Sequence, residues 1–148
     1  MANELLLFLD FDGVLHPQHE GMPTPKEYLF CHLSRFEAVM IDFPAVRIVI
    51  SSTWRTQFPL EKLKGYFSPT IQTRIIGITP YIESGKRIDE ILLWLRENGV
   101  AENSQWIALD DAGWEFAGFK DHLVECRWYN GFQEREEIEL RRILECNS

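Results

Sequence analysis

The sequence has few cysteines, no long apolar run and no excess of positive charge. Its three cysteines are odd in number and form no CxxC pair, which argues against both a disulfide framework and a zinc site. The longest apolar run is far too short to cross a membrane. The net charge of -8 repels nucleic acid and anionic membranes, so a phosphate-bearing ligand would need local cations.

Targeting segments and compositionally biased tracts are also missing. No basic region precedes the first apolar stretch, and that stretch ends in Asp-Phe-Asp, which favours a strand over a signal peptide. A chain of 148 residues is a common size for one domain and can bury a core without disulfides. We therefore expect one cytoplasmic domain over residues 1–148.

Five short apolar segments are predicted to be strands: residues 5–9, 46–51, 74–79, 105–111 and 122–128. Apolar residues at helical spacing predict one helix before Pro44 and another before Asn98-Gly99. A shorter helix fits residues 59–66, and a charged helix fits residues 133–145. The alternation of strands and helices indicates an α/β fold with a mainly parallel five-stranded sheet.

Polar side chains follow several of these strands. Ligands of parallel sheets bind outside the carboxyl ends of the strands, so these side chains are expected to meet on one rim. Clustered carboxylates raise one another's pKa unless a cation neutralises them, and hard oxygen ligands suit Mg²⁺. The residues concerned are Asp10, Asp12, Ser51, Ser52, Asp110 and Asp111, with Lys86 and Arg87 at the start of a helix.

Asp10 and Asp12 are two residues apart at the end of the first segment. We expect both to lie in the strand, where side chains two residues apart share one face. Gly13 would then let the backbone turn sharply away. This arrangement would place one carboxylate near a metal and a phosphorus atom and the other beside the leaving group.

Four motifs occur in order over residues 5–111. They are FLDFDGVL, IVISS, a lysine that opens a helix, and WIALDD. With these motifs the sequence resembles the haloacid dehalogenase (HAD) superfamily of aspartate-nucleophile phosphatases. The segments SSTWR, KRIDEILLWL and LVECRWYNGF are further similar to the HAD domains of the Swiss Army Knife RNA-repair group. The resemblance implies a Rossmann-like three-layer sandwich.

The resemblance also implies roles for the acidic residues. Asp10 would attack phosphorus and become an aspartyl-phosphate, while Asp12 would protonate the leaving oxygen and then activate water. Mg²⁺ would be held by the Asp10 carboxylate, the Asp12 backbone carbonyl and either Asp110 or Asp111. Positioned cations and hydrogen-bond donors stabilise the charge that spreads over the transferring phosphoryl group.

A serine hydroxyl and a lysine would hold the phosphoryl oxygens in such a site. Ser51 and Ser52 both remain candidates, because a slip of one residue turns a strand side chain to the opposite face. Lys86 is favoured as the cation because it matches the usual residue type. Arg87, its neighbour, could substitute for it.

Three tryptophans, Trp54, Trp114 and Trp128, follow strand segments at the expected rim. They either pack over loops or form an aromatic wall for a base or another flat leaving group. The histidines His16 and His19 lack metal-ligand spacing and are interpreted as loop residues.

The gaps between motifs are too short for a separate cap domain, so the resemblance implies a capless phosphatase. Its open rim would bring cations and stacking surface together. We expect nucleotides or short oligonucleotide ends with a terminal phosphate to be preferred over sugar phosphates.

Two other functions compete with a phosphatase. A receiver-like signalling module also combines a parallel sheet, an acidic pair, a hydroxyl and a lysine. In receivers, however, the acidic pair follows the first strand and the acceptor follows the third, which does not fit this order of motifs. An inactive binding domain with the same fold is disfavoured because every motif retains its functional residue type.

Overall fold

Five parallel strands form the centre of the fold, in the order β3-β2-β1-β4-β5. They belong to a computed structural model that describes residues 5–83 and 85–147. Each observed strand lies within a predicted segment, so the parallel five-stranded sheet is confirmed. The strands are β1 (Leu5–Leu9), β2 (Val46–Ile50), β3 (Ile75–Ile78), β4 (Trp106–Asp110) and β5 (Leu123–Glu125).

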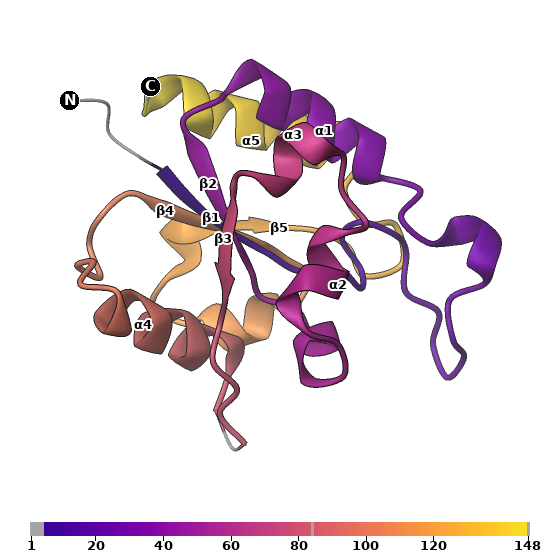
Figure 1. Ribbon diagram of the computed structural model, residues 1–148, viewed down its shortest axis with the longest axis horizontal. Helices are drawn as coiled ribbons and strands as arrows, with labels where there is room; N and C mark the ends of the chain where they lie inside the picture. Colours follow the sequence, from indigo (N-terminus) through magenta and orange to yellow (C-terminus); the bar gives the residue numbers. More distant parts are fainter. Residues whose placement is uncertain (1–4, 84, 148) are drawn as a thin grey trace.

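Helices cover both faces of this sheet (Figure 1). One face carries α1 (Leu33–Asp42), α3 (Pro69–Gln72) and α5 (Glu134–Cys146), and the other carries α4 (Arg87–Glu97). The short helix α2 (Leu60–Lys64) follows β2. The architecture is the expected Rossmann-like three-layer α/β sandwich. The sequence did not predict α3 or the short 3-10 helices η1 (Lys26–Tyr28), η2 (Thr53–Thr56), η3 (Gly113–Phe116) and η4 (Lys120–His122).

The strands of the sheet are buried on both faces. Leu7 and Leu9 of β1 belong to the core cluster that includes Phe36 of α1 and Leu140 of α5. Phe8, which points the other way, belongs to the cluster formed with α4. Because both faces are covered, the strands are continuous apolar runs instead of alternating patterns.

Local sequence signals explain the ends of α4. The Asp89 side chain accepts a hydrogen bond from the backbone N–H of Lys86 at 3.1 Å, which satisfies one of the free donors at the start of the helix. The helix ends at Glu97, and Gly99 follows with a φ of 70°. The predicted helix stop at Asn98-Gly99 is thus confirmed.

The segment between β1 and α1, residues 13–32, forms a loop that we call the flap. It contains η1 and isolated β-bridges, including one between His19 and Met22, and extends to the right in Figure 1. Among the helices of the described residues, none combines the length and the apolar character needed to cross a membrane.

Candidate active site

The sheet register brings three polar residues together at neighbouring strand ends. Leu9 of β1 pairs with residue 50 of β2 and residue 109 of β4. The next residues are Asp10, Ser51 and Asp110, and all three are buried. The residues that precede them on the three strands belong to the larger core cluster. Because successive side chains of a strand point to opposite faces, Asp10, Ser51 and Asp110 point to the other face of the sheet, which α4 covers.

Arg87, the first residue of α4, lies against these strand ends. Its Nη1 atom is 3.2 Å from Oδ1 of Asp10 and 3.4 Å from Oδ2 of Asp110, and it also donates to the carbonyl oxygen of Ser51. Glu115 holds the start of the helix by accepting the backbone N–H of Arg87 at 2.6 Å. Burial lowers the pKa of the Arg87 guanidinium, but the carboxylates of Asp10 and Asp110 outweigh burial and hold that pKa above its ordinary value.

Lys86 occupies a different environment from its neighbour. It is the exposed residue that precedes α4, and its backbone N–H is bound to Asp89. The cation that the structure places against the carboxylates is therefore Arg87. A sequence signal for this exists, because Arg87 precedes the buried Ile91 by four residues and so shares its face of the helix.

Three carboxylates form one cluster at this point. Asp10, Asp110 and Asp111 offer oxygen atoms that all lie within 4.8 Å of one another. Burial and the neighbouring Asp111 raise the pKa of Asp10 to about 8 despite the opposing effect of Arg87. Burial and the neighbouring Asp10 raise the pKa of Asp110 to about 8, and burial and Asp110 raise that of Asp111 to about 6.

One guanidinium does not balance three carboxylates, so full ionisation of this cluster requires another cation. The donor set consists of hard oxygen atoms on rigid backbone, which fits Mg²⁺. Asp10 and either Asp110 or Asp111 are the side chains that could hold it.

Gly13 makes room for this cluster. Its φ of 77° lies in the left-handed region, which favours glycine. A Cβ atom at this position would also overlap the carboxylate of Asp111. The glycine behind the two aspartates therefore provides both the turn and the space for the third carboxylate.

The two candidate serines have different partners. Ser52 caps η2, and its Oγ atom accepts the backbone N–H of Trp54 at 3.2 Å. Ser51 lies beside Asp10 at the strand end. Its buried Oγ atom has no hydrogen-bond partner among the described residues. A buried hydroxyl without a partner is unfavourable and is commonly satisfied by a ligand or water.

Asp12 lies apart from the carboxylate cluster. The prediction placed Asp10 and Asp12 on one strand, but β1 ends at Leu9, before either residue. The Oδ1 atom of Asp12 is 2.8 Å from Nε2 of His16 and 3.1 Å from Nε1 of Trp54. His16 was expected to be an ordinary loop residue, and no periodic pattern in the flap could have revealed this contact.

Comparison with known proteins agrees with these features. The family model of the HAD domain in Swiss Army Knife RNA repair proteins matches residues 6–136. The chain belongs to this family. No curated protein gives a significant match. Membership of the HAD superfamily indicates a phosphatase-type hydrolase that acts on a phosphorylated substrate, and the residues of the carboxylate cluster all fall within the matched range.

Two of the three rim tryptophans of this HAD domain border a cavity of about 510 Å³ beside Asp111. Trp114 is 70% exposed and Trp128 is 39% exposed. Three cations also line this cavity, which we call the aromatic cavity. They are Lys120, Arg127 and Arg135.

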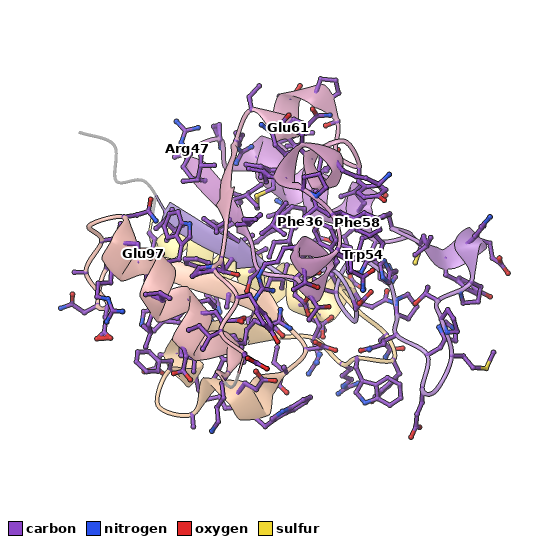
Figure 2. The ribbon with its side chains drawn as sticks, turned by 60° about the horizontal axis from the view of Figure 1, so that its bottom comes forward. Phe36, Arg47, Trp54, Phe58, Glu61 and Glu97 are labelled. Atoms are coloured by element: carbon purple, nitrogen blue, oxygen red, sulfur yellow. The ribbon has the colours of Figure 1, made fainter. Side chains whose placement is uncertain are left out.

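Trp54 occupies a different place. It is half-buried and packs against the larger core cluster, with its ring 6.0 Å from that of Phe58 (Figure 2). Together with Asp12 and residues of the flap, it lines a second cavity of about 410 Å³, the flap cavity. The expected wall of three tryptophans is thus divided between two cavities.

Proposed function

We propose that this HAD domain is a Mg²⁺-dependent phosphomonoester hydrolase that acts through an aspartyl-phosphate on Asp10. The observation that carries the proposal is the contact of Arg87 with Asp10 inside a cluster of three carboxylates, of which Asp10 and Asp110 are buried and Asp111 is half-buried. The proposed nucleophile, a cation and the proposed metal ligands thereby meet at neighbouring strand ends. These are the groups that phosphoryl transfer requires.

In the first step, a carboxylate oxygen of Asp10 forms a bond to phosphorus while the bond from phosphorus to the leaving oxygen breaks. Asp12 gives its proton to that leaving oxygen. In the second step, water attacks phosphorus, Asp12 accepts a proton from the water, and the aspartyl-phosphate bond breaks. Phosphate is released and Asp10 is regenerated.

Arg87 and Ser51 are proposed to bind the oxygen atoms of the phosphoryl group. The guanidinium would stabilise negative charge on Asp10 and on the phosphoryl oxygens during the transfer. The Ser51 hydroxyl, which has no partner among the described residues, would donate a hydrogen bond to one of those oxygens.

The raised pKa of Asp10 supports a metal requirement, because an uncharged carboxyl group is a poor nucleophile. We propose that the Asp10 carboxylate, the Asp12 backbone carbonyl and Asp110 or Asp111 hold Mg²⁺. When bound, this ion supplies positive charge that favours the ionised form of Asp10 and polarises the phosphoryl oxygens.

Nucleotides or nucleic-acid ends with a terminal phosphate are the proposed substrates. Two exposed tryptophans line one cavity beside Asp111, which suits a flat base. Its three cations, which share the cavity with the carboxylates of Glu125 and Glu139, would bind a second phosphate. The net charge of -8 disfavours long polyanions, so recognition would be local. A capless domain over residues 1–148 would leave this cavity open to a bulky substrate. The cytoplasmic location remains a prediction.

The test is hydrolysis of a generic aryl phosphate with and without Mg²⁺, for the wild type and for Asp10→Asn. We expect hydrolysis that depends on Mg²⁺ and an inactive variant, because the amide supplies neither the nucleophile nor the negative charge of a metal ligand. A phosphoenzyme trapped by acid quench in the wild type should be absent from the variant. Full activity of Asp10→Asn would exclude this mechanism.

A further inference from the structure

Two N–H groups from separate segments converge on the carboxylate of Asp12. Nε2 of His16, in the flap, lies 2.8 Å from Oδ1. Nε1 of Trp54, in η2, donates to both oxygens at 3.1 Å. The Asp12 side chain is 32% exposed, so an unrestrained carboxylate at this position would be free to rotate.

The tautomer of His16 follows from its second hydrogen bond. The backbone N–H of Phe30 donates to Nδ1 of His16 at 3.2 Å, so Nδ1 acts as an acceptor and carries no hydrogen. The ring hydrogen of neutral His16 is therefore on Nε2, which donates it to Asp12. Because His16 is fully buried, water does not reach its ring nitrogens, although the Asp12 carboxylate that one of them meets is partly exposed.

The backbone of Phe30 adopts an unusual conformation where it meets His16. Its φ of 58° lies in the left-handed region, which bulky residues rarely adopt. The ring of Phe30 packs against those of Tyr66 and Trp54, with centroids 4.5 Å and 5.5 Å away. This packing holds the strained residue in place and with it the N–H that fixes the His16 ring.

Trp54 is fixed as firmly as His16. Ser52 binds its backbone N–H, and Phe11 and Phe30 contact its ring edge to face. These contacts leave the indole N–H directed at Asp12. The exposed edge of the Asp12 carboxylate then faces the flap cavity, through which water and a leaving group can reach it.

We propose that His16 and Trp54 are positioning residues that hold the Asp12 carboxylate in the orientation needed for proton transfer. This inference rests on the proposed function, in which Asp12 acts as acid and then as base. Since both steps use Asp12, loss of its orientation should slow formation and hydrolysis of the phosphoenzyme alike. Substrate binding does not depend on this proton transfer, so we expect kcat to fall and KM to stay unchanged.

The chain contains a matched control pair on the other face of the sheet. Trp106 donates its indole N–H to the carbonyl of Glu102 at 2.8 Å. The ring of His122 stacks on that of Trp106 and pairs through Nδ1 with its carbonyl oxygen. Trp106→Phe and His122→Gln therefore remove similar partly buried interactions that do not involve Asp12.

The experiment compares steady-state and single-turnover kinetics of Trp54→Phe, His16→Leu and His16→Gln with those of the two control variants. Acid–base groups contribute about 10²–10⁴-fold, so we expect kcat to fall at least about tenfold in Trp54→Phe and further in His16→Leu. KM should change little. His16→Gln, whose amide can still donate to Asp12, should recover part of kcat, and the controls should lower thermal stability with kcat preserved.

A second readout does not depend on activity. In ¹⁵N-labelled wild-type protein, His16 should be the tautomer with hydrogen on Nε2, and Asp12→Asn should shift the His16 and Trp54 side-chain resonances. The other tautomer would overturn the proposal, as would an unchanged kcat or an equal loss in the controls. Inactive wild-type protein would overturn the proposed function and this inference together. Normal kcat in the positioning variants alongside slow Asp12→Asn would overturn this inference alone.

Discussion

Arg87 places its Nη1 atom 3.2 Å from Oδ1 of Asp10, at the meeting point of α4 and β1. Removing one partner of a buried ion pair leaves an uncompensated charge, which is strongly destabilising unless that group changes its protonation state. Here a carboxyl group can do so by taking up a proton. The contact thus couples the charge of the proposed nucleophile to that of Arg87.

Substitutions of Arg87 should show whether Arg87 or Lys86 stabilises the phosphoryl group. We expect Arg87→Ala to lower kcat by about 10²–10³-fold, the usual effect of removing one preorganised donor from developing charge. Arg87→Lys should lose less activity because it keeps the positive charge. The measurement is kcat for an aryl phosphate at saturating Mg²⁺.

Lys86→Ala is the matched control, because it removes a neighbouring exposed cation. Its kcat should remain close to that of the wild type. If Lys86→Ala were instead the more damaging of the two substitutions, the lysine expected from the sequence would be the residue that serves the phosphoryl group.

The stability of the metal-free protein should fall as the pH rises from about 4 towards about 8. In this range an unfolded aspartate is ionised, whereas burial raises the pKa of Asp10 and Asp110 to about 8 and that of Asp111 to about 6 in the folded protein. The native state therefore binds more protons than the unfolded state, and its stability decreases with pH. Denaturant unfolding in EDTA across this range measures the effect.

Two comparisons test whether the carboxylate cluster causes this pH dependence of stability. Asp110→Asn should flatten the profile, because an amide cannot ionise. Mg²⁺ should raise Tm more at pH 8 than at pH 5, since it binds the ionised carboxylates. Equal slopes for the wild type and Asp110→Asn would show that the buried aspartates do not control this dependence.

Much of the fold follows from signals that the chain carries locally. Strands covered on both faces form apolar runs, and α1 and α4 show helical spacing with clear stop signals. By contrast, α3 spans only Pro69–Gln72, barely one turn, so it contains too few residues to display a period. The 3-10 helices are similarly short.

The same distinction applies to the residues of the candidate site, because some follow local sequence signals and others depend on how a loop folds. Asp10, Ser51 and Asp110 were among the residues expected at the rim because they directly follow apolar runs, but the sequence left Ser51 and Ser52, and likewise Asp110 and Asp111, as alternatives. The contacts of His16 could not be predicted, because they depend on how the flap folds over η2. Loop geometry of this kind leaves no period in the sequence.

The two serines should differ in the property that their substitution changes most, which is kcat/KM for Ser51 and stability for Ser52. Ser51→Ala removes a buried hydroxyl without a partner among the described residues, so stability should hold while kcat/KM falls about ten- to a hundredfold. Ser52→Ala removes the cap of η2 and should cost about 1 kcal/mol of stability. Thermal melts and steady-state kinetics of both variants measure these effects. The reverse pattern would transfer the phosphate contact to Ser52.

The aromatic cavity gives a prediction about substrate choice. Stacking on an aromatic side chain contributes about 1–3 kcal/mol per base, which corresponds to about 5- to 150-fold in kcat/KM. We expect a 3′-phosphorylated dinucleotide and a 5′-nucleotide to be better substrates than a hexose phosphate. Trp114→Ala and Trp128→Ala should reduce this preference without affecting the hexose phosphate.

Tyr81→Ala provides the control for these variants, because Tyr81 is 62% exposed but lies outside the aromatic cavity. The preference for nucleotides should survive this substitution. In the wild type, the preference for nucleotides should weaken with added salt if Arg127 or Lys120 binds a second phosphate, because salt screens exposed charges. A hexose phosphate that outperforms both nucleotides, or tryptophan variants with an unchanged ranking, would mean that the base does not bind here and that the exposed rings have another use.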